Sequence, residues 1–213
     1  MDETYKRSEH WSGVYRDRAI DDVSWFQPSA TPSLELLEAA GVSRDAAVID
    51  VGAGASTLVD GLLARGFRDV TLLDIAPEAL AATRARVGDR PELRYEVADV
   101  LTWRSPRRFA VWHDRAVFHF LTEGADRDAY RHTLDAALAP DGIVVIATFA
   151  LDGPERCSGL PVCRYSPETL ATEVAGLLRP VDARREWHRT PAGKDQVFTF
   201  VRFERAHVAA AAS

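Results

Sequence analysis

The sequence predicts an α/β fold in which a mostly parallel sheet is covered by helices. From residue 47 onward, short β-rich apolar runs alternate with segments whose apolar residues recur at helical spacing. This alternation is typical of βαβ units. The chain has 213 residues, of which 46% are hydrophobic and 27% are charged. These values are those of one globular domain that buries a substantial core.

Three apolar runs are expected to form the first three strands, with helices after the first two. The runs cover residues 47–51, 70–73 and 93–97. Leu58, Leu62 and Leu63 follow the first run at a spacing that places them on one helix face. Pro77 suits the first turn of a second helix, which is expected to continue over residues 78–87.

The fourth and fifth strands are expected over residues 109–112 and 143–149, with a helix between them. Apolar residues from Tyr130 to Leu138 share one face of that helix. The Pro-Asp-Gly sequence at residues 140–142 is expected to end it.

The pattern changes after the fifth strand. Residues 150–164 form a long loop with several glycines and prolines, and loops of this length are often functional, so it is a candidate lid. A helix is expected over residues 167–178. Two further runs, around residues 184–188 and 196–203, flank a turn-rich segment at 191–195, which predicts a terminal antiparallel hairpin.

The chain is expected to have three parts. Residues 1–30 form an aromatic arm that is a candidate lid, residues 31–205 form the domain, and residues 206–213 form a low-complexity tail. The domain is expected to begin with a helix over residues 32–40. The aromatic residues of the arm are Trp11, Tyr15, Trp25 and Phe26.

Charge and hydropathy disfavour several classes of protein. The 32 acidic and 26 basic residues give a formal net charge of −6, which disfavours a protein that coats phosphate backbones. The basic segment at residues 104–108 is short and fits a solvated loop, so we expect no nucleic-acid partner. The sequence has no apolar run of about eighteen residues and no apolar core of a secretory signal near residue 1. We therefore expect neither membrane insertion nor export.

The two cysteines indicate a reducing compartment. Cys157 and Cys163 are too few to form a disulfide framework in a chain of this length. Zinc-binding cysteine pairs are usually two to four residues apart, whereas these are six apart and lack a second pair. We expect two free thiols, no metal and a cytoplasmic location.

Polar residues follow the first three expected strands, where an open parallel sheet binds its ligands. Asp50 and two glycines end the first strand, Asp74 ends the second, and Asp99 ends the third. Glycines let backbone amides approach a ligand closely, and a carboxylate can accept two ribose hydroxyls or an exocyclic adenine amine. The alternative is that the three aspartates only cap helices. Thr57 stands where a dinucleotide-binding fingerprint has its third glycine, which disfavours an NAD-dependent oxidoreductase.

With these residues, the sequence resembles the class I S-adenosylmethionine-dependent methyltransferases. Their first motif, an acid followed by x-Gly-x-Gly, is matched by Asp50, Gly52 and Gly54, and Ser56 stands where many members have a third glycine. The resemblance covers roughly residues 32–203. It implies a Rossmann-like three-layer α/β/α sandwich whose seven-stranded, mostly parallel sheet has an antiparallel last strand.

The resemblance also implies a cofactor, S-adenosyl-L-methionine, which leaves as S-adenosyl-L-homocysteine. The glycine loop would hold its methionine portion, Asp74 with Ile75 its ribose, and Asp99 with Val100 its adenine. Other residues expected at the cofactor are Trp11, Tyr15, Trp25 and Asp114. The aromatic rings could cover the cofactor and stabilise its cation. The alternative is an arm that only packs on the domain.

A narrower resemblance concerns the substrate. The Trp11/Tyr15 and Trp25-Phe26 elements are similar to those of a branch that includes protein lysine methyltransferases, and thiopurine-type small-molecule enzymes share the tryptophan element. The segment at residues 113–119 is similar to that branch's Asp-Lys-Gly-Thr-Phe-Asp. Arg115 replaces its lysine, which puts a lysine substrate in doubt.

Two residues after the fourth strand are candidate catalytic bases. Asp114 and His119 are expected next to the transferred methyl group, where they could take a proton from the acceptor. Alternatively, Asp114 caps a turn or pairs with Arg115, and His119 lies within the core. His113 is expected to point away from Asp114, to the opposite side of the strand.

The sequence thus predicts a methyltransferase that acts on a nitrogen, oxygen or sulfur atom of a small molecule. Protein lysine is the alternative acceptor. A partner or sensor protein that binds the cofactor without transferring methyl groups is the alternative of another class.

Overall fold

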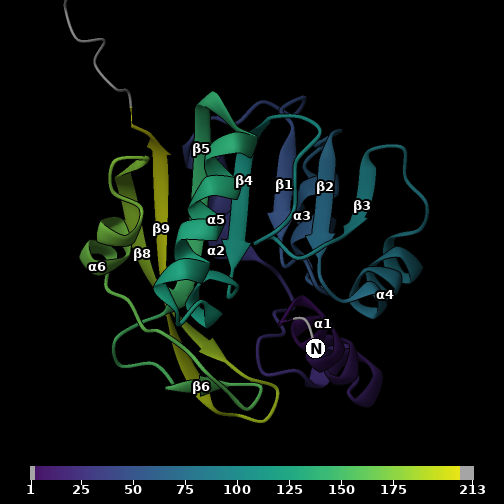
Figure 1. Ribbon diagram of the computed structural model, residues 1–213. Coiled ribbons are helices and arrows are strands. Elements are labelled where there is room, and N and C mark those ends of the chain that lie inside the picture. Colours follow the sequence, from purple (N-terminus) through teal and green to yellow (C-terminus); the bar gives the residue numbers. More distant parts are fainter. Residues whose placement is uncertain (1–2, 207–213) are drawn as a thin grey trace, which may run out of the picture.

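The computed structural model describes residues 3–206, and its centre is a seven-stranded sheet between helices (Figure 1). The strand order is β3-β2-β1-β4-β5-β9-β8. Strands β1 to β5 pair in parallel, whereas β9 runs antiparallel to both β5 and β8. The predicted Rossmann-like α/β fold, its antiparallel strand and the terminal hairpin are thereby confirmed. Residues 207–213 of the predicted tail lie outside the described residues.

The strands and helices alternate along most of the chain. The strands of the main sheet are β1 (Val48–Val51), β2 (Val70–Asp74), β3 (Leu93–Val97), β4 (Phe109–Arg115), β5 (Leu138–Phe149), β8 (Leu178–Arg189) and β9 (Asp195–Arg205). The helices are α1 (Glu3–Asp17), α2 (Thr31–Ala39), α3 (Leu58–Ala64), α4 (Pro77–Val87), α5 (Gly124–Ala137) and α6 (Pro167–Glu173), with short 3-10 turns η1 (Ile20–Asp22) and η2 (Phe118–Phe120). None of the helices within residues 3–206 has the length and apolarity needed to cross a membrane.

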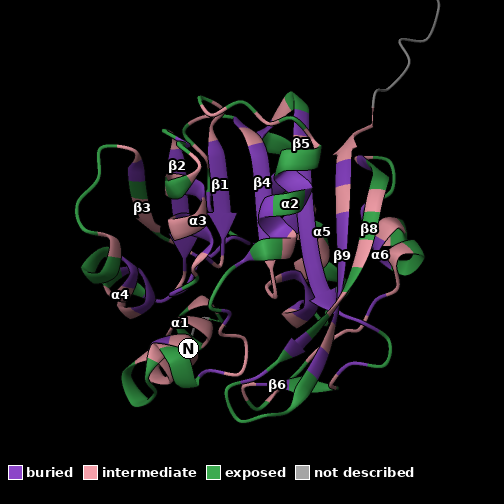
Figure 2. Cartoon of the chain, turned by 180° about the vertical axis from the view of Figure 1, so that it is seen from behind, coloured by how far each residue is buried: buried purple, intermediate pink, exposed green. Residues whose placement is uncertain are grey.

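Two apolar cores lie on opposite faces of the sheet. Successive side chains of a strand point to opposite faces, so Ile49 and Trp112 pack with α5 and α6, whereas Val48 and Val111 pack with α2 and α3. Central strands are therefore buried on both faces, and the edge strand β8 is mostly exposed (Figure 2). This alternation decides where the functional side chains of β4 point.

Several boundaries differ from the sequence prediction. Strand β4 continues to Arg115, because the polar residues at its end have buried hydrogen-bond partners. Strand β5 begins at Leu138, and a register shift absorbs the Pro-Asp-Gly sequence that was expected to end the preceding helix. Helix α6 stops at Glu173, ahead of Gly176 with a φ of 83°.

Two segments for which the sequence predicted no helix or strand have regular structure. The aromatic arm contains the 15-residue helix α1, which crosses beneath the carboxyl ends of β1 and β2 (Figure 1). The long loop after β5 contains a small hairpin of β6 (Arg156–Cys157) and β7 (Leu160–Pro161). Both segments therefore reach the functional edge of the sheet as ordered elements.

A buried polar network joins β4 to α5. The Tyr130 hydroxyl donates to Asp114 Oδ2 at 2.7 Å and accepts from Trp112 Nε1 at 2.8 Å. All three side chains are fully buried. Buried polar groups of this kind are costly when they lose a partner.

We expect Tyr130→Phe to reduce the free energy of unfolding by about 1–3 kcal/mol, because it leaves Trp112 and Asp114 without their shared partner. Urea denaturation measures the change. Tyr5→Phe removes a hydroxyl from an exposed side chain and is the matched control. Equal stability of the two variants would contradict a structural role for the network.

Candidate functional site

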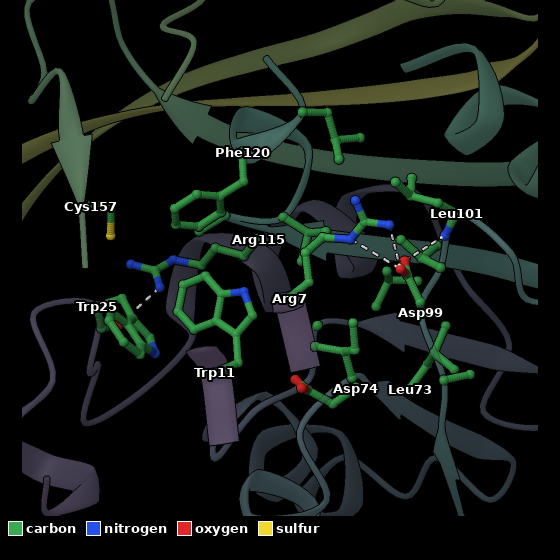
Figure 3. Close-up of a pocket in the computed structure, with 18 of the residues that line it drawn as sticks. Arg7, Trp11, Trp25, Leu73, Asp74, Asp99, Leu101, Arg115, Phe120 and Cys157 are labelled. Atoms are coloured by element: carbon green, nitrogen blue, oxygen red, sulfur yellow. Dashed lines mark hydrogen bonds and ion pairs between the residues drawn. The ribbon is translucent and has the colours of Figure 1, made fainter. Parts of the chain in front are cut away.

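The main pocket lies between the ends of the parallel strands and α1 (Figure 3). Eight of the predicted cofactor residues line it: Trp11, Tyr15, Trp25, Gly52, Asp74, Ile75, Asp99 and Val100. An adjoining pocket is lined by three more: Asp50, Gly54 and Ser56. The folded chain thus brings together residues that are up to about ninety positions apart in sequence.

The Asp74 carboxylate holds the glycine loop against the end of β2. Its Oδ2 accepts the Gly54 amide at 2.7 Å, and its Oδ1 accepts the Ala76 amide at 2.8 Å. Burial raises the pKa of Asp74 to about 6, against the lowering effect of these hydrogen bonds. Asp74 therefore organises the loop as well as facing the pocket.

The glycines of the loop are required by backbone conformation and by close approach. Gly52 has a φ of 62° and Gly54 a φ of 52°, in the region that favours glycine. A Cβ at Gly52 would lie 2.0 Å from Val117 Cγ2, and one at Gly54 would lie 2.4 Å from the Tyr15 hydroxyl oxygen. The loop consequently packs closely against both α1 and the segment after β4.

Asp50 is held by a buried histidine. His113 Nδ1 lies 2.7 Å from Asp50 Oδ1, and His113 Nε2 lies 2.8 Å from Ser33 Oγ. All three side chains are buried. As the sequence indicated, His113 points to the opposite side of β4 from Asp114, and it orients Asp50 at the start of the glycine loop.

Helix α1 binds the carboxylate that was expected to meet adenine. Arg7 Nη2 donates to Asp99 Oδ2 at 2.7 Å, and Thr4 Oγ1 donates to the same oxygen at 3.1 Å. Asp99 Oδ1 accepts the Leu101 amide at 3.0 Å. The sequence analysis missed Arg7, although its spacing of four from Trp11 places both residues on one helix face.

Aromatic side chains from the arm cover the pocket. The Trp11 ring centroid lies 5.9 Å from that of Trp25 and 4.9 Å from that of Phe120, both in edge-to-face geometry. The centroids of Tyr15 and Trp25 are 6.3 Å apart. Such pairs are favourable beyond their buried area. The three predicted aromatic residues therefore form one cluster together with Phe120, which sequence reasoning did not identify.

Asp114 is not placed as predicted. It is fully buried, its Oδ1 accepts the Val117 amide at 2.9 Å, and its Oδ2 accepts the Tyr130 hydroxyl. Because β4 is longer than expected and Asp114 faces α5, its side chain lies outside the pocket lining. These contacts are those of the alternative, in which Asp114 caps the turn after β4, and its predicted role at the cofactor or as a base stays a prediction.

His119 is likewise directed away from the pocket. It is fully buried between Phe120 and Phe149, and its Nδ1 accepts the Phe149 amide at 3.3 Å. Burial lowers the pKa of His119 to about 3, so the ring is neutral at physiological pH. This environment is that of the alternative, in which His119 lies within the core, and its predicted role as a base stays a prediction.

The acceptor side of the pocket contains two residues that the sequence analysis did not assign to it. Arg115 ends β4, and Cys157 lies on the β6 hairpin. Burial raises the pKa of the Cys157 thiol, which keeps it protonated. Both cysteines are free, and residues 3–206 contain no group of three His, Cys, Asp or Glu side chains placed to hold a metal ion.

Comparison with known proteins agrees with the geometry of the site. Residues 48–142 match the family model described as a methyltransferase domain. This segment of the chain is therefore similar to methyltransferase domains. The match spans β1 to the start of β5, which is the part that carries the glycine loop, Asp74 and Asp99.

Several known methyltransferases are similar to part of this chain. Trans-aconitate 2-methyltransferase of Sinorhizobium medicae is 33% identical over 117 residues, 54% of this chain and 43% of that protein. EEF1A lysine methyltransferase 2 of Danio rerio is 26% identical over 156 residues, 66% and 67% of the two chains. The first curated relatives are matched over about half of their length.

A solved methyltransferase has the same fold. It is the 1,6-didemethyltoxoflavin-N1-methyltransferase of Burkholderia thailandensis, with S-adenosylhomocysteine and 1,6-didemethyltoxoflavin bound. The TM-score is 0.69 at 23% identity, and the match covers 97% of this chain and 92% of that one. Helix α1 and the terminal hairpin therefore lie within the shared architecture.

We expect the stability of Asp114→Asn relative to the parent to increase with pH. Burial raises the pKa of Asp114 in the folded state to about 6 from an ordinary 3.8. Folding is therefore favoured when this group is protonated, below about pH 4, and that contribution is lost as pH rises through 6. Asparagine cannot ionise and does not lose this contribution. The unfolding free energy of Asp114→Asn minus that of the parent should therefore rise by about 2–3 kcal/mol between pH 4 and 7.

Urea denaturation at several pH values measures this shift. The raised pKa of Asp74 is present in both proteins and cancels in the comparison. A difference that stays constant with pH would show that Asp114 ionises normally in the folded protein.

Proposed function

We propose that this chain transfers the methyl group of S-adenosylmethionine to a nucleophilic nitrogen, oxygen or sulfur atom of a small molecule. The observation that carries the proposal is the order of groups along one edge of the sheet. The glycine loop follows β1, Asp74 ends β2, and Asp99 lies just beyond β3. These groups suit, in turn, the methionine, ribose and adenine portions of the cofactor.

The residues present fit this cofactor. Gly52 lines the main pocket and Gly54 lines the adjoining one, and both hold a left-handed backbone conformation that glycine adopts freely. The Asp74 carboxylate and the apolar Val100 and Leu101 side chains line the same pocket. S-adenosylmethionine, when bound, supplies an electrophilic methyl group on a sulfonium.

The arm is proposed to cover the cofactor. Helix α1 is attached at one end through Arg7 to Asp99, and Ser8 Oγ donates to the Ile75 carbonyl at 3.1 Å. The Trp11, Tyr15 and Trp25 rings follow toward the glycine loop. Aromatic faces attract cations, so this cover suits a sulfonium.

The rest of the chain is proposed to act through position and exclusion of water. On the acceptor side the pocket wall contains no carboxylate or imidazole among the described residues, because Asp114 and His119 are buried elsewhere. Methyl transfer is an in-line displacement, which needs the two reactants held in line in a dry site more than it needs a strong base.

A small molecule is favoured over a protein lysine. A lysine ammonium would have to approach beside the Arg115 guanidinium, and like charges in a pocket repel. A lysine ammonium would also lack a counter-charge there, since no carboxylate among the described residues lines the main pocket beside Arg115 and Asp114 is buried against α5. Because a lysine methyltransferase is among the similar proteins, a screen of methyl acceptors should include protein lysines.

The free thiols of Cys157 and Cys163 support a proposed location in the cytoplasm, where thiols stay reduced.

We expect S-adenosylhomocysteine to bind the purified chain with micromolar affinity, and Asp74→Ala to weaken that binding at least about tenfold, since it removes the ribose acceptor and releases the Gly54 amide. Isothermal titration calorimetry measures both, with NAD as a control ligand. Asp89→Ala removes an exposed aspartate and should leave the affinity unchanged. Undiminished binding by Asp74→Ala would contradict the proposed site, and absence of binding in the folded parent would refute the cofactor.

We expect Trp11→Ala to raise the dissociation constant for S-adenosylhomocysteine about tenfold, because the aromatic cover over the cofactor would be opened. The same titration measures it. Trp187→Ala removes an exposed ring on β8 that does not line either pocket, and is the matched control. Similar affinities for both variants would mean that the arm only packs on the domain.

A further inference from the structure

Arg115 is a shielded cation whose donors are largely unused. Its Nη1 donates to the Trp25 carbonyl at 2.9 Å. Its Nε and Nη2 are screened from solvent and have no hydrogen-bond partner among the described residues. A guanidinium carries five N–H donors, and unpaired donors in a buried position are costly. The unused donors are therefore a feature that a ligand could satisfy.

The surroundings of the guanidinium hold it in place without neutralising it. Its central carbon lies 4.4 Å from the ring centroid of Phe198. Glu186 is the acid that acts most strongly on it, yet the Glu186 carboxylate accepts from Gln27 Nε2 at 2.7 Å, and no ion pair links it to Arg115 within residues 3–206. Desolvation lowers the pKa of Arg115 to about 10, so the group remains cationic at neutral pH.

Arg115 lies at the boundary of the cofactor groups: it lines the adjoining pocket with the glycine loop, and it lines the main pocket beside Phe120 and Cys157. The groups assigned to the cofactor follow β1, β2 and β3, which form one side of the sheet. Arg115 ends β4 and stacks on Phe198 of β9, toward the other side. Figure 3 shows the Arg115 guanidinium between Trp25 and Cys157, away from Asp99.

The rest of the main pocket wall beside Arg115 is apolar. Trp25, Phe120, Val117 and Cys157 share the wall with Arg115. One cation in an apolar, aromatic wall selects an organic molecule with one anionic group, since the planar fork of a guanidinium matches a carboxylate.

We infer that the methyl acceptor carries a carboxylate on an apolar or unsaturated body, and that Arg115 binds this carboxylate. The inference rests on the proposed methyltransferase function. Arg115 is thus a specificity-determining residue that places the acceptor opposite the cofactor, while the nucleophile lies elsewhere on the acceptor. The methionine portion of the cofactor also has a carboxylate, so the test must separate the two sources.

The experiment compares Arg115→Gln, Arg115→Lys and the parent in two titrations. The first uses S-adenosylhomocysteine alone and also 5′-methylthioadenosine, which lacks the amino-acid portion. The second uses protein saturated with S-adenosylhomocysteine and a panel of carboxylates, cinnamate and trans-aconitate among them, with cinnamamide as the uncharged probe. Arg184→Gln removes an arginine from the surface of β8 and is the matched control.

We expect all proteins to bind S-adenosylhomocysteine within about twofold of the parent, which also shows that the variants are folded. Carboxylates should bind the saturated parent and the Arg184→Gln control better than cinnamamide does. Arg115→Gln should lose at least about tenfold in carboxylate affinity, and Arg115→Lys should fall between.

Three results would overturn the inference. If Arg115→Gln still binds carboxylates with the affinity of the parent, Arg115 is not the residue that binds them. Failure of every carboxylate at millimolar concentration to bind the saturated parent would exclude the substrate class. Loss of S-adenosylhomocysteine affinity in Arg115→Gln with 5′-methylthioadenosine affinity intact would assign Arg115 to the cofactor carboxylate. A parent that binds no S-adenosylhomocysteine would instead refute the proposed function itself.

Discussion

The hydrogen bonds from the Gly54 and Ala76 amides to the Asp74 carboxylate connect the end of β2 to the loop that follows β1. This contact fixes the glycine loop in its left-handed conformation, and the loop in turn forms the surface on which the Tyr15 hydroxyl and the Val117 side chain pack. Because Asp74 is buried and its charge is desolvated, the amides are its principal compensation. The pocket, the position of α1 and the path of the chain after β4 all follow from this arrangement.

Strand β4 divides the site by simple alternation. His113 and Arg115 point toward the side of the sheet that carries α2 and Phe198, where one orients Asp50 and the other enters the pocket. Asp114, between them, points to α5 and caps the turn after the strand. Three consecutive polar residues thus serve three different purposes, and the direction of each side chain decides which one.

The fold, and most of the residues that line the pocket at the ends of β1 to β3, could be predicted from the sequence because both depend on local patterns. Alternating strand and helix periodicities indicated the sheet, and a loop of glycines and strand-end aspartates indicated where a nucleoside would bind. The acceptor side of the pocket could not be predicted in this way. Arg7, Phe120 and Cys157 reach the pocket only through the packing of α1, η2 and the β6 hairpin, which are distant from one another in sequence.

The unexpected length of β4, which places Asp114 in the core, has a physical explanation. A change from apolar to polar residues usually indicates the end of a strand, so the sequence predicts that β4 ends before His113. Tyr130, Ser33 and Asp50 supply buried partners for those polar groups, and the strand continues. These buried hydrogen-bond partners belong to other elements of the fold, so the local sequence of β4 does not predict them.

We propose that the cofactor lies along the ends of β1, β2 and β3 and leaves the part of the pocket beside Arg115 free for the acceptor. A crystal structure with S-adenosylhomocysteine bound tests it most directly. The account predicts adenine beside Val100 and Asp99, ribose hydroxyls on Asp74, the homocysteine chain over Gly52 and Gly54, and no contact between the cofactor and Arg115. A cofactor whose carboxylate pairs with Arg115, or whose adenine lies away from Asp99, would contradict it.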